Sequence, residues 1–188
     1  MNITKTLYVT TRAEWRRWLG KNHSSAKEIW LIFYRKASGK KRIPYNDAVE
    51  EALCYGWIDS ISKGIDGSKW GQRFTPRRRR SFWSEMNKER VQRLIRKGKM
   101  TRAGLLAFHG NGNIAKGAPA RWTIPPDILR SLKKNPQVWT NFRKFSPPYQ
   151  RIRVGWIDAA RKRPEIFRQR LRYFIRMTER GKQYGMVQ

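Results

Sequence analysis

The chain has 188 residues, of which 43 are Lys or Arg and 13 are Asp or Glu, so its formal net charge at pH 7 is +30. Aromatic residues make up 13%, including nine Trp, which excludes a disordered basic tail because such segments contain few aromatic residues. One Cys excludes an intramolecular disulfide framework, and two His leave little for metal chemistry, so we expect no metal and no cofactor. A folded chain with this self-repulsion is expected to work beside a polyanion.

The location of the protein is expected to be cytoplasmic. No part of the sequence approaches the roughly 18 consecutive apolar residues that a membrane span needs. The N-terminal segment lacks the apolar core of a signal peptide. The sequence therefore predicts no membrane insertion.

The first part of the chain begins with helix and strand signals in alternation. Thr11 and Glu14 have the spacing of a capping box, which predicts a short helix through Leu19 that Gly20 can end. Residues 28–34 are β-branched and aromatic, and they predict a buried strand.

A second helix and two further strands are expected next. Pro44 favours a helix start, and Gly56 supplies a left-handed residue after the helix end. Residues 57–61 and 70–74 predict strands joined by a turn at 64–67. We expect an α+β fold with a small antiparallel sheet and flanking helices.

From Ser81 onward the apolar residues recur at helical spacing, so a helical C-terminal module is expected. Ser84 can cap a helix with Asn87, Val91, Leu94 and Ile95 on its inner face. The Gly/Asn-rich stretch 109–122 predicts a linker. Further helices are expected at Thr101–Phe108, near 126–134, at 136–145, and from Pro147 and Pro164, the last with Phe167, Leu171, Phe174 and Ile175 inward.

Among the predicted strands, the segment with the composition most typical of a ligand-binding site is GWIDS at residues 56–60. Trp57 and Asp59 share one face of the strand, and Gln72 and Phe74 can lie opposite on the returning strand. An acid, an amide and two aromatic rings are a candidate ligand face. The alternative interpretation is that the aromatic rings are core residues and that Asp59 caps or pairs with a nearby Arg.

Basic residues with interleaved aromatic residues suggest a different kind of site. Residues 61–188 hold 32 of the Lys and Arg residues and only seven acidic ones. Arg side chains suit phosphate oxygens, and exposed aromatic rings can stack on bases. The predicted nucleic-acid-binding residues in the first cluster are Lys63, Lys69, Arg73, Arg77, Arg78, Arg79, Arg80, Lys88 and Arg90.

A second basic surface is expected on the C-terminal helices. Its predicted members are Arg151, Arg153, Arg161, Lys162, Arg163, Arg168, Arg172 and Arg176. The chain has no recognition-helix, RRM or KH signature, so contacts with the phosphate backbone are expected, without readout of bases.

Several segments together are typical of one family. They are CYGWIDS at 54–60, QRFTPR at 72–77, SFWS at 81–84 with Asn87 and Arg90, and then Leu94, Gly98, Met100, Thr101 and Gly104. With these segments the chain resembles the YdeI/OmpD-associated family, also labelled bacteriocin-protection proteins, as an unusually basic member. The region from Pro147 to Gly185 is similar to the helical OmdA-type module of that family. The resemblance implies a YdeI-like α+β domain at 1–108 and an OmdA-like helical module at 123–188, with no established catalytic residues.

Three functions follow as hypotheses. The first is a non-enzymatic, sequence-independent nucleic-acid-binding protein whose partner is RNA or DNA, with the ribosome as one candidate partner. The second is a stress or bacteriocin-protection protein that binds an acidic protein or a small ligand through the Trp57–Asp59 face. The third, an enzyme using Asp59 or Cys54, is not expected, because no second carboxylate has a spacing suited to acid–base work.

Overall fold

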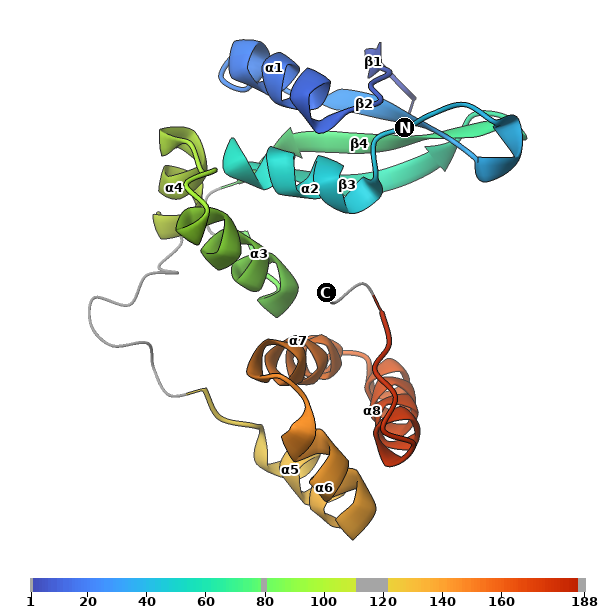
Figure 1. The fold of residues 1–188 in the computed structure, drawn as a ribbon, viewed down its shortest axis with the longest axis vertical. Coiled ribbons are helices and arrows are strands. Elements are labelled where there is room, and N and C mark those ends of the chain that lie inside the picture. The colour runs from blue at the N-terminus through green and yellow to red at the C-terminus, as the bar shows by residue number, and fades with distance from the viewer. Residues whose placement is uncertain (1, 79–80, 111–121, 186–188) are drawn as a thin grey trace. The chain divides into compact units, whose positions relative to one another are not determined.

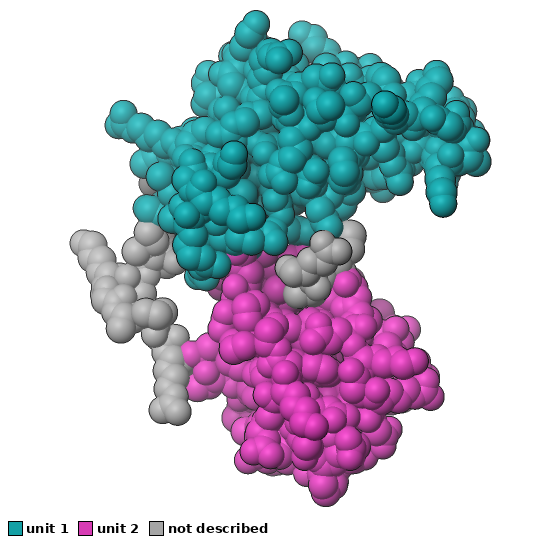
Figure 2. All heavy atoms as spheres, in the orientation of Figure 1, with its two compact units in different colours: residues 1–81, 90–114 teal, residues 82–89, 115–188 magenta. Residues whose placement is uncertain are grey.

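A computed structural model of the protein describes residues 2–78, 81–110 and 122–185, and the chain divides into two compact units (Figures 1 and 2). Unit 1 consists of residues 1–81 and 90–114, and unit 2 consists of residues 82–89 and 115–188. The predicted linker at 109–122 falls almost wholly outside the described residues. The expected α+β class with a helical C-terminal region is confirmed.

Unit 1 contains a four-stranded sheet with the strand order β1-β2-β4-β3. Its strands are β1 (Thr6–Leu7), β2 (Ile29–Tyr34), β3 (Trp57–Gly64) and β4 (Lys69–Pro76). Strand β4 pairs antiparallel with both β2 and β3, as expected for a hairpin and its neighbour. Strand β1 was not predicted, because two residues carry no alternation to detect, and it pairs parallel with β2. The sheet is therefore mixed, whereas a purely antiparallel sheet was expected.

Local sequence signals explain the helices of unit 1, which are α1 (Arg12–Asn22), the short 3-10 helix η1 (Lys36–Ser38), α2 (Tyr45–Cys54), part of α3 (Glu85–Arg96) and α4 (Arg102–His109). Thr11 and Glu14 form the predicted capping box at the start of α1. Gly20 does not end that helix, because the His23 N–H donates to the Leu19 carbonyl and continues it. Gly56 has the predicted left-handed conformation, with φ of 75°.

The core of unit 1 lies between the sheet and helices α1 and α2, which Figure 1 shows beside it. The Trp15 ring of α1 packs edge-on against Phe74 of β4, with 5.5 Å between the ring centroids. The indole N–H of Trp15 donates to the Ala48 carbonyl of α2 at 3.0 Å. Buried aromatic rings thus connect both helices to the strands, and each buried ring of this size contributes a large apolar area.

Helix α4 approaches the end of α2 so closely that only glycine fits at residue 104. A Cβ added at Gly104 would lie 2.2 Å from the Cys54 carbonyl oxygen and 2.8 Å from that of Leu53. We expect Gly104→Ala to destabilise unit 1 by about 3 kcal/mol, because backbone atoms must move to admit the methyl group. The control is Gly67→Ala, where no atom lies within 4 Å of the added Cβ. Urea unfolding measures both, and equal midpoints for the two variants would contradict this packing.

Unit 2 is helical, with α5 (Pro126–Lys133), α6 (Pro136–Lys144), α7 (Pro147–Asp158) and α8 (Pro164–Glu179). Each of these four helices starts at a proline, which has no N–H to leave unsatisfied at that position. Their apolar faces meet in one core of Ile128, Leu132, Val138, Phe142, Phe145, Tyr149, Val154, Ile157 and Phe174. Phe167, Leu171 and Ile175 of α8 pack against it, as predicted.

Helix α3 follows its predicted pattern with one exception. Val91 and Leu94 are buried, but Ile95 is 40% exposed, so its place on the inner face was wrongly predicted. Ile95 lies about 80° around the helix from the first inner position, Asn87, and therefore at the edge of the apolar stripe. Among the described residues, no helix is both long and apolar enough to cross a membrane.

Candidate functional site

The candidate ligand face is largely part of the core of unit 1. Trp57, Gln72 and Phe74 are each at most 4% exposed. The Trp57 indole donates to the His23 carbonyl at 3.0 Å, and the Gln72 amide donates to the Ile61 carbonyl at 3.2 Å. These contacts fit the core interpretation of the three residues, and they leave little of each side chain for a ligand.

Asp59 is partly exposed and belongs to a polar cluster. The Tyr45 hydroxyl donates to its carboxylate, and both burial and this hydrogen bond raise the pKa of Tyr45. Burial lowers the pKa of Arg77 to about 10, although the nearby Asp59 charge opposes the effect. Burial also lowers the pKa of Arg90, whose guanidinium donates to Asn46 at 2.8 Å. Asp59 therefore acts as a counter-charge for partly buried Arg side chains.

Cys54 lies in the interior of unit 1. It is fully buried at the end of α2, and burial together with the Glu51 charge raises the pKa of its thiol to about 11. A thiol of that pKa stays protonated at neutral pH and is a poor nucleophile. The described residues contain no cluster of three or more His, Cys, Asp or Glu side chains that could hold a metal ion.

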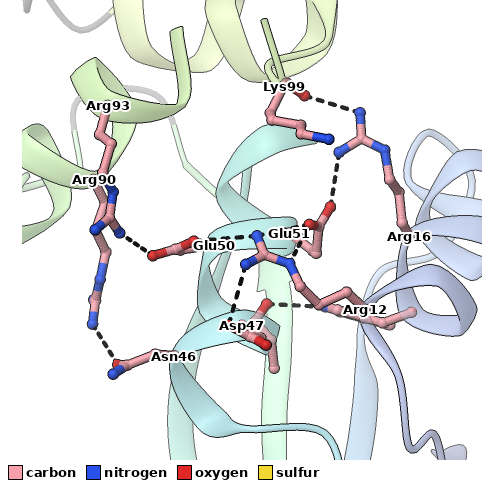
Figure 3. A network of polar contacts seen from close by, with 11 residues as sticks. Arg12, Arg16, Asn46, Asp47, Glu50, Glu51, Arg90, Arg93 and Lys99 are labelled. Carbon is pink, nitrogen blue, oxygen red and sulfur yellow. Dashed lines mark hydrogen bonds and ion pairs between the residues drawn. The ribbon is translucent and has the colours of Figure 1, made fainter. Parts of the chain in front are cut away.

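An ion-pair network on α2 uses several basic residues of unit 1 (Figure 3). Arg12 donates to Glu51 at 2.8 Å, to Glu50 at 3.1 Å and to Asp47 at 3.2 Å. Arg16 donates to the second oxygen of Glu51 at 2.8 Å, and Arg93 pairs with Glu50. Glu50 and Glu51 are almost fully buried, so these cations are needed to compensate carboxylate charges that are largely shielded from water.

Five of the predicted nucleic-acid-binding residues also form ion pairs with acidic side chains. These are Lys69 with Asp66, Arg73 with Glu28, Lys88 with Glu85, Arg151 with Glu89, and Arg161 with Asp127 and Asp158. Formal charge at these positions is partly cancelled by a neighbour. A phosphate would have to compete with that carboxylate.

The remaining residues of the predicted set differ in exposure. Lys63 and Arg78 are exposed, whereas Arg79 and Arg80 lie outside the described residues. Arg153 is only 5% exposed, and its guanidinium carbon lies 4.4 Å from the Tyr184 ring centroid and 5.3 Å from that of Tyr149. Arg153 thus packs inside unit 2 as a cation among aromatic rings.

Five predicted residues are exposed together on α8 and the turn before it. We call Lys162, Arg163, Arg168, Arg172 and Arg176 the α8 basic face. Arg168, Arg172 and Arg176 recur every four residues, so they lie on one side of the helix. Within the described ranges, no ion pair joins any of the five to an acidic residue.

A pocket of about 650 Å³ lies beside this face. It is lined by Trp156 of α7 and by Ile166, Gln169, Arg170, Arg172, Tyr173 and Arg176 of α8. The Arg170 guanidinium stacks 4.3 Å from the Trp156 ring centroid and donates to the Trp156 carbonyl at 2.5 Å. This pocket could not be predicted from the sequence, because its residues come together only when α7 and α8 pack.

Two family models match the chain. Residues 7–107 match a model described as a domain of unknown function (DUF8412), which covers more than half of the chain. The chain belongs to the DUF8412 family. Residues 122–181 match the model described as "Bacteriocin-protection, YdeI or OmpD-Associated" (OmdA), which confirms the YdeI/OmpD-associated resemblance. Searches of curated proteins and of solved structures found no match.

The OmdA module of this DUF8412 protein carries the α8 basic face. Residues 161–182 contain nine Lys or Arg and two Glu. Neither family description names a ligand or a reaction, so the function is inferred from this surface.

Proposed function

We propose that the protein binds nucleic acid without sequence preference, through the phosphate backbone, and that the α8 basic face makes the main contacts. The observation that carries this proposal is a row of exposed Arg side chains that form no ion pair with an acidic residue among the described residues. Elsewhere in both units, carboxylates compensate many basic side chains. A phosphate would complete the α8 basic face without displacing a partner.

The geometry of α8 suits a polyanion. Four helical residues rise about 6 Å, which is comparable with the separation of neighbouring phosphates along one nucleic-acid strand. Arg172 and its neighbours at that spacing can therefore meet successive phosphates. Guanidinium groups also offer two parallel donors to phosphate oxygens. Ribosomal RNA and chromosomal DNA both present such a backbone.

Some predicted residues are left out of this surface. Arg77 and Arg90 are partly buried, and Arg153 is almost fully buried. Their side chains contribute to the folds of the two units. The proposed contacts are those of the α8 basic face, with Lys63 and Arg78 as candidates on unit 1.

Binding to duplex DNA and to structured RNA, measured between about 50 and 200 mM salt, tests the proposal. With five phosphate contacts, log K is expected to fall with log salt at a slope of about −4.5 on duplex DNA. Binding that is weak and independent of salt would overturn the proposal.

The alternative is a stress or bacteriocin-protection protein that binds an acidic protein or a small ligand through the Trp57–Asp59 face. The OmdA description favours this class by its wording, whereas the burial of Trp57, Gln72 and Phe74 does not. A pull-down from nuclease-treated lysate separates the two proposals. A stoichiometric protein partner that survives the nuclease favours the alternative.

A further inference from the structure

We propose that the pocket beside α8 takes one unpaired base of a single-stranded segment, while Arg172 and Arg176 hold its flanking phosphates. This inference rests on the proposed nucleic-acid binding and adds a substrate class to it. The pocket combines aromatic rings, guanidinium groups and one amide, which are the groups that bind unpaired nucleotides.

Aromatic and guanidinium surfaces in the pocket can hold a base. Tyr173 is 37% exposed and lines the pocket, and the Arg176 guanidinium lies 5.3 Å from its ring centroid. Arg170 is fixed against Trp156 by stacking and by its hydrogen bond to the Trp156 carbonyl. A guanidinium held in this way has a second planar face, on which a base can stack.

Charge favours a phosphate at the same place. Three of the lining side chains are Arg, and none of the lining residues is Asp or Glu. Burial lowers the pKa of Arg170, and the nearby Arg163 charge lowers it further. An arriving phosphate would relieve this repulsion among cations. The three Arg groups therefore favour an anion next to the stacked base.

The size and polarity of the pocket fit a nucleotide of any sequence. Its volume of about 650 Å³ lies within the range of small-molecule sites. Gln169 offers the only amide among the lining residues, and an amide can both donate to and accept from a base edge. This chemistry accepts all four bases. A paired base cannot enter without leaving its stack, which costs energy and favours single strands.

The test measures the affinity of the full chain for two labelled probes. One is single-stranded oligo(dT) of roughly 16 nucleotides, and the other is the duplex that it forms with oligo(dA). Tyr173→Leu is expected to weaken oligo(dT) binding roughly 5- to 50-fold, since the ring is lost, and duplex binding less than about 2-fold. Tyr173→Phe keeps the ring and should match the unaltered protein. An equal loss on both probes, or no loss on oligo(dT), would overturn the inference.

Two Arg variants separate the pocket from general charge. Arg172→Gln removes a lining residue, whereas Arg168→Gln removes an equal charge from the same face outside the pocket. We expect the Arg172 variant to reduce oligo(dT) binding several-fold more than the Arg168 variant, and equal effects would count against the pocket. If the unaltered protein binds neither probe, the proposed function itself fails. If it binds the duplex with a salt slope but the Tyr173 variant changes nothing, only the pocket inference fails.

A measurement on the unaltered protein covers the case in which the Tyr173 variant does not fold. Oligonucleotides carrying 5-iodouracil cross-link to nearby aromatic side chains when irradiated. The cross-linked peptide is expected to contain Trp156 or Tyr173. Cross-links confined to peptides of unit 1 would overturn the inference.

Discussion

Replacing four Arg residues of the α8 basic face by Gln is expected to weaken binding to duplex DNA about 4 × 10³-fold at 0.1 M salt. The four are Arg163, Arg168, Arg172 and Arg176. Each phosphate contact adds about 0.9 to the salt slope on duplex DNA, and this corresponds to nearly 10-fold in affinity at that salt concentration. The slope of log K against log salt should therefore become less steep by about 3.6. Fluorescence anisotropy at several salt concentrations gives both numbers.

The matched control removes the same charge from other helices of unit 2. It replaces Arg130, Lys133, Arg143 and Lys144 by Gln, all of which are exposed on α5 and α6. We expect this control to lower the affinity less than about 10-fold, because it changes the general field without removing the proposed contacts. Equal losses in the two variants would show that the net charge of the protein determines binding, and that the position of the charges on the α8 basic face does not.

The second large effect concerns the stability of unit 1. Arg12→Met is expected to lower its free energy of unfolding by about 2–3 kcal/mol. The substitution leaves the buried carboxylates of Glu50 and Glu51 without a shared cation, and Arg16 and Arg93 then compensate them only in part. Because the Arg12 side chain is 39% exposed, the cost lies below that of a fully buried pair.

Arg17→Met is the control for this prediction. Arg17 lies on the same helix but is exposed, so we expect a change within about 0.5 kcal/mol. Chemical unfolding followed by circular dichroism measures both variants. If Arg12→Met is as stable as the control, the network in Figure 3 does not stabilise unit 1 in solution.

Local rules predicted much of the fold. The Thr11–Glu14 capping box, the left-handed Gly56 and the prolines that start the C-terminal helices each act within a few residues, so the sequence alone reveals them. Strand β1 depends on a partner more than 20 residues away and carries no pattern of its own. Ile95 shows that an apolar residue at the edge of a helical stripe can remain exposed.

The sequence predicts that the candidate site is basic, but it does not predict which basic side chains are exposed or which form ion pairs. Counting Arg residues placed Arg153 and Arg168 in one set, yet the fold buries the first among aromatic rings and exposes the second. The carboxylates that pair with Arg73 and Arg151 lie 45 and 62 residues away, beyond any local motif. The pocket at Trp156 and Tyr173 likewise requires α7 and α8 to be packed together.

Purification of the tagged protein from ultraviolet-irradiated cells, without nuclease, shows whether the protein binds nucleic acid in the cell. We expect the protein to carry covalently attached RNA or DNA, with the cross-linked peptides mapping to α8 and its neighbouring turn. The variant that lacks Arg163, Arg168, Arg172 and Arg176 should carry much less of the same polymer. Protein that emerges free of nucleic acid, with a stoichiometric acidic protein bound in its place, would contradict the account.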